Sequence, residues 1–184
     1  MDDEKIILGI DPGTRILGWG VVRSFGNSVT FWDMGVVDMH SETDHYIKLG
    51  IIFREVSALI NRFNPTDLSI EAPFYGKNVK SMFLLGRAQG AAITAALSLG
   101  IPVSEYAPRK IKMSITGRGA ASKEQVANLL YNILKIEQSV NYFDATDALA
   151  VAYCHFLETS RPYSGKGFNE SWKSFVKRNS SRVK

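Results

Sequence analysis

The 184-residue chain is poor in cysteine and has no long apolar segment. Its one cysteine, Cys154, excludes an internal disulfide and any zinc site built from several cysteines, and it favours a reducing compartment. No apolar run approaches the roughly 20 residues that span a bilayer. The chain begins MDDEK, which is acidic and unlike a signal peptide. We therefore expect a cytoplasmic protein that has no membrane partner.

Net charge is also small, but it is unevenly distributed. The chain has 22 Lys and Arg against 18 Asp and Glu, a formal net charge of +4. The net charge is +7 over residues 77–135 and +6 over 161–184, whereas it is −5 over 1–76 and −4 over 136–160. Basic segments of this kind favour a polyanionic partner. We expect one folded domain over residues 1–160 and a mobile basic tail over 161–184; a tail that serves only solubility is the alternative.

The apolar periodicity predicts alternating strands and helices. Five short runs have the composition of strands, and five longer stretches show the helical spacing of apolar residues. The expected strands are 5–11, 17–25, 29–37, 67–72 and 102–106, and the expected helices are 44–63, 79–99, 108–115, 122–135 and 143–157. Gly26-Asn27 predicts a hairpin between the second and third strands. This order predicts an α/β fold with a five-stranded mixed sheet and helices on both faces.

Four acidic residues stand where the chain can bring them together. Asp11 ends the first expected strand and Glu71 ends the fourth, and ligands of α/β sheets lie beyond such carboxyl ends. Asp144 and Asp147 are three residues apart at the start of the last helix, so they share one face of its first turn. Structural alternatives exist for each. Asp11 can open the turn that follows it, Glu71 can be an ordinary strand end, and the two helix aspartates can complement the helix dipole.

Four carboxylates in one pocket repel one another and raise each other's pKa values, so they need cations. Oxygen ligands with room for water favour Mg²⁺, with Mn²⁺ as the substitute. A pair of such ions about 3.5–4 Å apart is the usual device for in-line cleavage of phosphodiesters. The four acids therefore favour a pair of metal ions, an arrangement used for phosphodiester cleavage.

Six segments, in this order, resemble the RuvC family of bacterial Holliday junction resolvases. They are GIDPGT (9–14), SIEAPFYGKN (69–78), LGRAQGAAI (85–93), EYAPRKIK (105–112), GRGAASKEQV (117–126) and DATDALAVA (144–152). The resemblance implies an RNase H-like fold and a Mg²⁺-dependent endodeoxyribonuclease of DNA recombination and repair. Such an enzyme resolves four-way junctions by paired symmetric nicks that leave 5′-phosphate and 3′-hydroxyl ends.

The resemblance also implies roles for individual residues. The metal-binding tetrad of the family corresponds to Asp11, Glu71, Asp144 and Asp147; some members have His where this chain has Asp144. Family lysines near the scissile phosphate correspond to Lys112 and Lys123, for which a merely solvated or phosphate-positioning lysine is the alternative. Phe74 corresponds to an aromatic residue that stacks on bases at the junction centre, and the alternative is a loop residue folded onto the core.

The basic segment and its helix carry the remaining expectations. The residues expected to contact DNA are Phe74, Tyr75, Lys77, Lys80, Arg87, Arg109, Lys110 and Arg118. Helix 79–99 corresponds to the family's dimer helix, with Gly86 and Gly90 at the homodimer interface; close packing on its own sheet is the alternative. The family further implies cooperation with the RuvA–RuvB branch-migration complex and a place at the bacterial nucleoid.

Three other functions fit parts of the sequence. DPGT (11–14) also resembles the phosphate loop of actin-like ATPases and sugar kinases, but those need two such domains, and 184 residues are too few. An RNA-processing nuclease of RNase H-like fold shares GIDPG, although it is not expected to combine Phe74 with Lys112 and Lys123. A junction-binding protein without catalysis gains nothing from four acids that face phosphate.

Overall fold

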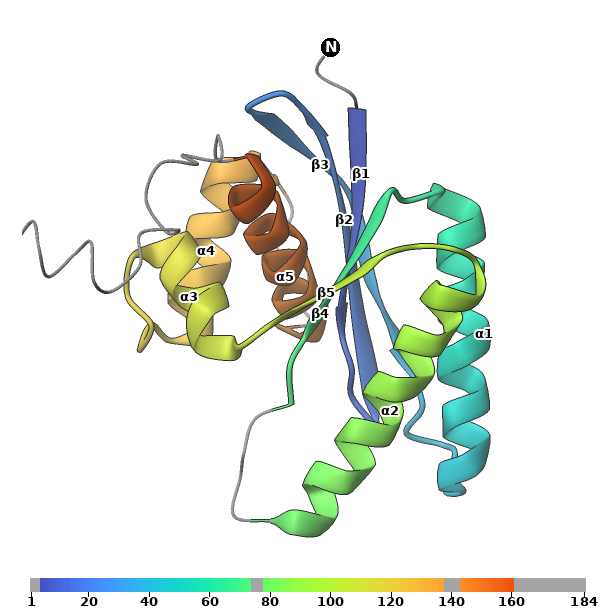
Figure 1. Ribbon diagram of the computed structural model, residues 1–184. Coiled ribbons are helices and arrows are strands. Elements are labelled where there is room, and N and C mark those ends of the chain that lie inside the picture. Colours follow the sequence, from blue (N-terminus) through green and yellow to red (C-terminus); the bar gives the residue numbers. More distant parts are fainter. Residues whose placement is uncertain (1–3, 74–77, 138–142, 161–184) are drawn as a thin grey trace, which may run out of the picture.

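The computed structural model describes residues 4–73, 78–137 and 143–160, and it shows a sheet between two layers of helices (Figure 1). Strands and helices follow the expected order within about three residues of the expected bounds. The elements are β1 (Glu4–Asp11), β2 (Ile16–Phe25), β3 (Ser28–Asp38), α1 (His45–Phe63), β4 (Asp67–Glu71), α2 (Val79–Ser98), β5 (Val103–Tyr106), α3 (Pro108–Thr116), α4 (Lys123–Leu134) and α5 (Phe143–Ser160).

The sheet has five strands in the order β3-β2-β1-β4-β5. β1 pairs antiparallel with β2 and parallel with β4, and β5 continues the parallel part. The apolar run IILGI makes β1 the central strand, because only a strand buried on both faces tolerates consecutive apolar side chains. The prediction of a five-stranded mixed sheet is confirmed.

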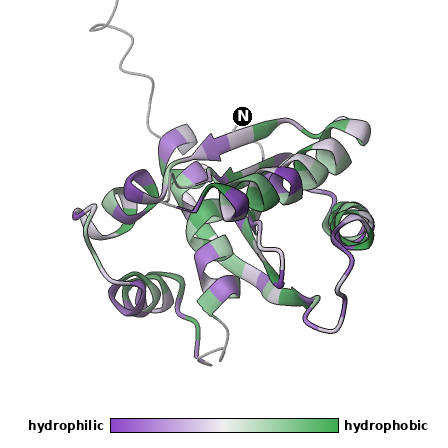
Figure 2. Cartoon of the chain, turned by 90° about the horizontal axis from the view of Figure 1, so that it is seen from below, coloured by the Kyte–Doolittle hydropathy of each residue, from purple (hydrophilic) through white to green (hydrophobic). Residues whose placement is uncertain are grey.

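Side chains of β1 alternate between two hydrophobic cores. Ile7 packs in the core beneath α3, α4 and α5, whereas Leu8 and Ile10 pack in the core beneath α1 and α2. Figure 2 shows apolar residues gathered where the helices meet the sheet. Both faces are therefore covered, as predicted. In the described part of the chain, no helix has the length and apolarity that would let it cross a membrane.

Helix α5 is the most deeply buried helix of the fold. Every residue from Ala148 to Phe156 is buried, and the helix packs directly on β1 and β2. Helix α4 begins at a capping box, in which Ser122 accepts from the backbone of Gln125 and the Gln125 side chain accepts from the backbone of Ser122. This cap fixes the position of the next residue, Lys123, against the first turns of α5.

Candidate active site

One pocket collects three of the four acids and both of the lysines that the sequence singles out. Asp11 ends β1 and Glu71 ends β4, and because these strands are parallel neighbours their carboxyl ends lie at the same edge of the sheet. Asp147 reaches the same place from α5. The lining residues are Asp11, Glu71, Pro108, Ile111, Lys112, Lys123, Val126, Asp147 and Ala150. Four aliphatic residues among them make an apolar wall beside three carboxylates and two ammonium groups.

Burial and mutual repulsion make these carboxylates poor acids. The pKa of Asp11 is raised to about 8, first by burial and then by the charges of Glu71 and Asp147. The pKa of Glu71 is raised to about 7 by burial and by Asp147, and burial also raises the pKa of Asp147. Asp144 adds its charge to this group without lining the pocket. The pocket therefore favours the binding of positive charge, either a proton or a cation.

Lys123 supplies part of that charge. Its ammonium donates a hydrogen bond to Asp147 Oδ2 in a salt bridge between α4 and α5. Burial alone would lower the pKa of Lys123, but the hydrogen bond to Asp147 and the charge of Asp11 outweigh it, and the net pKa is raised. Lys112 lines the pocket from α3, and its charge opposes the rise in the pKa of Glu71. The structure thus brings both predicted lysines to the predicted carboxylates.

The other residues predicted to contact DNA lie on α2, on α3 and in the loop after α3. Lys80 and Arg87 are exposed on α2, and Arg118 is exposed in the loop after α3. Lys110 is committed to an intramolecular salt bridge, 2.9 Å from Glu158 of α5, so its charge is already used within the fold. Arg109 packs its aliphatic stem against Gly119. Phe74, Tyr75 and Lys77 lie outside the described residues.

Gly86 and Gly90 lie on the open face of α2. A Cβ atom added to either glycine would meet no heavy atom within 4 Å from the other described elements. The alanines Ala88, Ala92, Ala95 and Ala96 pack one face of α2 in the core on the sheet, whereas Gly86 and Gly90 lie away from it. Beside Gly86, the exposed Val79 and Phe83 border an apolar pocket together with Met82 and Arg87. The open glycines and this apolar surface form one continuous helix face.

Sequence reasoning missed the residues that hold the site together. Thr146, buried between the two aspartates of α5, shares a hydrogen bond of 2.8 Å with Tyr131 of α4. Lys48 of α1 donates to the carbonyl oxygen of Thr14 at 2.9 Å and so braces the turn after Asp11. The threonine between the two aspartates of DATD could have indicated the contact between Thr146 and Tyr131. Nothing local marked Lys48, because its partner is 34 residues away.

The donor set suits a hard divalent cation. It consists of carboxylates, and burial and mutual repulsion raise the pKa values of Asp11 and Glu71. A bound cation would lower these pKa values again. Among the described residues, no three His, Cys, Asp or Glu side chains already stand at the spacing of a metal centre. In this conformation the Lys123 ammonium occupies the neighbourhood of Asp147. The residues therefore fit a metal by their chemistry, and in this structure Lys123 is paired with Asp147.

The comparisons with known proteins decide the family. The sequence model of the family described as "Crossover junction endodeoxyribonuclease RuvC" matches residues 7–155. The protein of that name from Bacteroides fragilis is 54% identical over 98% of this chain and 97% of its own length. The chain belongs to the RuvC family of crossover junction endodeoxyribonucleases. The RuvC of Porphyromonas gingivalis is 49% identical over 98% of both chains.

Solved RuvC structures confirm the fold. The structure titled "T. thermophilus RuvC in complex with Holliday junction substrate" is 30% identical, with a TM-score of 0.78 over 85% of this chain and 95% of that one. The yeast mitochondrial resolvase Ydc2 shares the fold at 12% identity, with a TM-score of 0.63. The RNase H-like fold expected from the sequence is therefore confirmed, and the chain is an endonuclease of the RuvC family.

Proposed function

We propose that this chain resolves four-way DNA junctions and that the pocket between β1, β4 and α5 is its active site. The observation that carries the proposal is the convergence of Asp11, Glu71 and Asp147 with Lys112 and Lys123 in one pocket. Buried carboxylates beside the ammonium groups of Lys112 and Lys123 suit hydrolysis of a phosphodiester, whose negative charge grows as water attacks.

Asp11, Glu71, Asp144 and Asp147 would hold two Mg²⁺ ions, with Mn²⁺ as a substitute. When bound, the metal supplies Lewis-acid activation of water and of the phosphate. The protein's own share is electrostatic. Lys112 and Lys123 place positive charge beside the same pocket, where it stabilises a phosphate that gains charge. The apolar wall formed by Pro108, Ile111, Val126 and Ala150 would restrict bulk water at the site.

DNA and a second copy of the chain complete the proposed assembly. The exposed Lys80, Arg87 and Arg118 would follow the phosphate backbone, together with Arg109 and the basic tail over 161–184. Phe74 would stack on a base at the junction centre, and Tyr75 and Lys77 would contact the DNA beside it. The α2 face with Gly86 and Gly90 would form a two-fold homodimer, whose paired sites cut symmetrically. We further propose that the protein cooperates with the RuvA–RuvB complex in the cytoplasm, at the bacterial nucleoid, as its similarity to the RuvC family implies.

The decisive experiment is a nicking assay on a synthetic four-way junction. The controls are a linear duplex of the same sequence and an RNA–DNA hybrid, each with Mg²⁺ and with EDTA. We expect paired nicks on the junction alone, only with Mg²⁺, with 5′-phosphates that ligase can seal. Cleavage of the hybrid in preference to the junction would instead support an RNA-processing nuclease.

Lys123→Met should separate the two roles of this lysine. In the metal-free protein the ammonium competes with a cation for Asp147, so its removal should tighten Mn²⁺ binding several-fold in calorimetric titration. Cleavage should nevertheless fall by about 10²-fold, since the charge that stabilises the phosphate is lost. Lys110→Met is the matched control, because Lys110 pairs with Glu158 outside the pocket. Weaker Mn²⁺ binding by Lys123→Met would contradict the competition.

A further inference from the structure

Helix α5 rests on bare backbone where it crosses the centre of the sheet. A Cβ atom added at Gly9 of β1, or at Gly18 or Gly20 of β2, would lie on the face of the sheet that α5 covers. Ile7 packs beneath α5 on the same face. Gly9 pairs with Gly20, and Gly18 pairs with Asp11, the proposed metal ligand. We call Gly9, Gly18 and Gly20 the glycine seat. The seat therefore adjoins the active site directly.

No side chain fits between the seat and the helix. A Cβ atom on Gly20 would lie 2.7 Å from the Cα and N atoms of Leu149, and one on Gly9 would lie 2.8 Å from the backbone N of Ala152. A Cβ on Gly18 would overlap the carbonyl oxygen of Asp144 and lie 2.5 Å from its carbonyl carbon. The obstructing atoms are mostly helix backbone, so rotating a side chain cannot relieve the clash.

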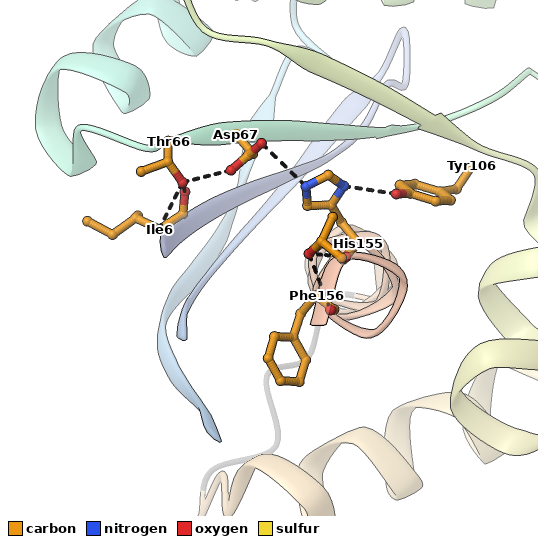
Figure 3. A network of polar contacts seen from close by, with 7 residues as sticks. Ile6, Thr66, Asp67, Tyr106, His155 and Phe156 are labelled. Carbon is orange, nitrogen blue, oxygen red and sulfur yellow. Dashed lines mark hydrogen bonds and ion pairs between the residues drawn. The ribbon is translucent and has the colours of Figure 1, made fainter. Parts of the chain in front are cut away.

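The far end of α5 is held separately by a polar cluster. Figure 3 shows the buried His155 of α5 between Asp67 of β4 and Tyr106 of β5. Tyr106 Oη lies 2.9 Å from His155 Nδ1, and Asp67 Oδ1 lies 3.6 Å from Nε2. Asp67 and Glu71 occupy the two ends of β4 and, four residues apart, share one face of it. One strand thus contacts α5 near His155 and presents Glu71 to Asp147 at the other end.

We infer that Gly9, Gly18 and Gly20 are positioning residues of the active site. They set the height of α5 above the sheet, and with it the distance of Asp144 and Asp147 from Asp11 and Glu71. Because His155 holds the far end, a methyl group at position 18 tilts the first turn of α5 away from the sheet and does not lift the whole helix. The inference rests on the proposed function of the pocket, and it adds residues that touch neither metal nor DNA.

The consequence is a large effect from a small change. A displacement of about 1 Å in a catalytic group costs about 10²-fold in rate, and loss of support behind metal ligands costs 10–100-fold in metal affinity. Gly18→Ala should therefore lower the single-turnover rate of junction cleavage by about 10²-fold and weaken Mn²⁺ binding by about 10-fold. Junction affinity in EDTA should stay within about 3-fold, since phosphate contacts are untouched.

The test compares three alanine variants of strand glycines at a temperature where circular dichroism shows each to be folded. Gly35→Ala is the matched control. Its Cβ would meet the ring of Trp19, 2.6 Å away, so it strains the same sheet without touching α5. Gly20→Ala serves if Gly18→Ala does not fold, and its effect should be smaller because Leu149 lies beyond the carboxylates. Mn²⁺ titration by calorimetry gives a readout independent of cleavage.

The outcomes separate the inference from the proposed function. If Gly18→Ala binds Mn²⁺ and cleaves like the unaltered protein, or if Gly35→Ala loses as much as Gly18→Ala, the positioning role is wrong. Asp147→Asn is measured alongside. If that variant keeps Mn²⁺ binding and cleavage, the pocket is not the metal site, and both the proposed function of the pocket and the positioning role fail.

Discussion

Asp147→Asn is expected to abolish junction cleavage in Mg²⁺ while leaving the junction bound. Asp147 lines the pocket with Asp11 and Glu71 and accepts a hydrogen bond from the Lys123 ammonium, so the amide removes a proposed metal ligand and a salt bridge together. Even residues behind metal ligands contribute 10–100-fold, so the loss should exceed about 100-fold. Junction affinity should change by less than about 3-fold, because a carboxylate that faces phosphate contributes nothing to backbone binding.

Single-turnover cleavage and a fluorescence binding assay measure the two quantities on the same variant. Asp38→Asn is a suitable control, because Asp38 is an exposed carboxylate that binds His40 outside the pocket. It carries the same chemical change and should cleave normally. Normal cleavage by Asp147→Asn would show that the Asp147 carboxylate is not needed as a metal ligand. Loss of junction binding would instead indicate that Asp147 has a structural role through Lys123.

Asp11→Asn should abolish cleavage and, in the metal-free protein, raise the melting temperature. The pKa of Asp11 is about 8 in the folded chain because of burial and of Glu71 and Asp147, compared with 3.8 for a free aspartate. Holding an ionised carboxylate there is unfavourable, and the amide removes this cost. A gain of 1 kcal/mol corresponds to about 2–4 °C for a domain of this size, so a rise of several degrees is expected.

The sign of the pH dependence follows from the same shift. Between about pH 4 and pH 8 the unfolded chain has lost the proton that folded Asp11 retains, so the free energy of unfolding of the metal-free protein falls as pH rises. Glu71, with a pKa of about 7, adds to the fall up to that pH. One group contributes at most about 1.4 kcal/mol per pH unit. Asp11→Asn should flatten this slope.

Thermal melts at pH 5 and pH 8, in EDTA and in Mg²⁺, test the prediction. Mg²⁺ should stabilise the unaltered protein at pH 8 and have little effect on Asp11→Asn, because a cation that binds only the folded state shifts the equilibrium toward it. Asp38→Asn should not raise the melting temperature, since hydrogen bonds from His40 lower the pKa of Asp38. A melting temperature of Asp11→Asn at or below that of the unaltered protein at pH 8 would contradict the pKa shift.

The order and type of the elements could be predicted from sequence because each carries a local signal. The apolar run of β1 indicated a central strand, Gly26-Asn27 indicated the β2–β3 hairpin, and Ser122 marked the start of α4. These signals act within a few residues, through burial, turn conformation and capping, so they need no knowledge of the rest of the fold. The strand-end places of Asp11 and Glu71 followed in the same way.

The sequence could not establish that the acidic residues come together, because their positions depend on how the strands pair. That Asp11 and Glu71 are neighbours depends on the parallel pairing of β1 with β4, which joins segments about 60 residues apart and is set by packing of both cores. The salt bridge of Lys123 with Asp147 and that of Lys110 with Glu158 depend on how α3 and α4 pack against α5. Charge counts could not distinguish these two lysines, although one lines the pocket and the other does not.

The sequence by itself determined the family and the candidate residues for the chemistry, which are four acids at the ends of strands and at the start of a helix and two lysines. Only the tertiary structure decided why Gly9, Gly18 and Gly20 stand where they do. In the sequence they are three glycines in apolar strands; in the fold they are the places where helix backbone meets sheet backbone. The neighbouring sequence gives no sign of these contacts, because the helix residues that a Cβ atom would meet lie more than 120 residues further along the chain. We infer that this contact sets the distances within the active site.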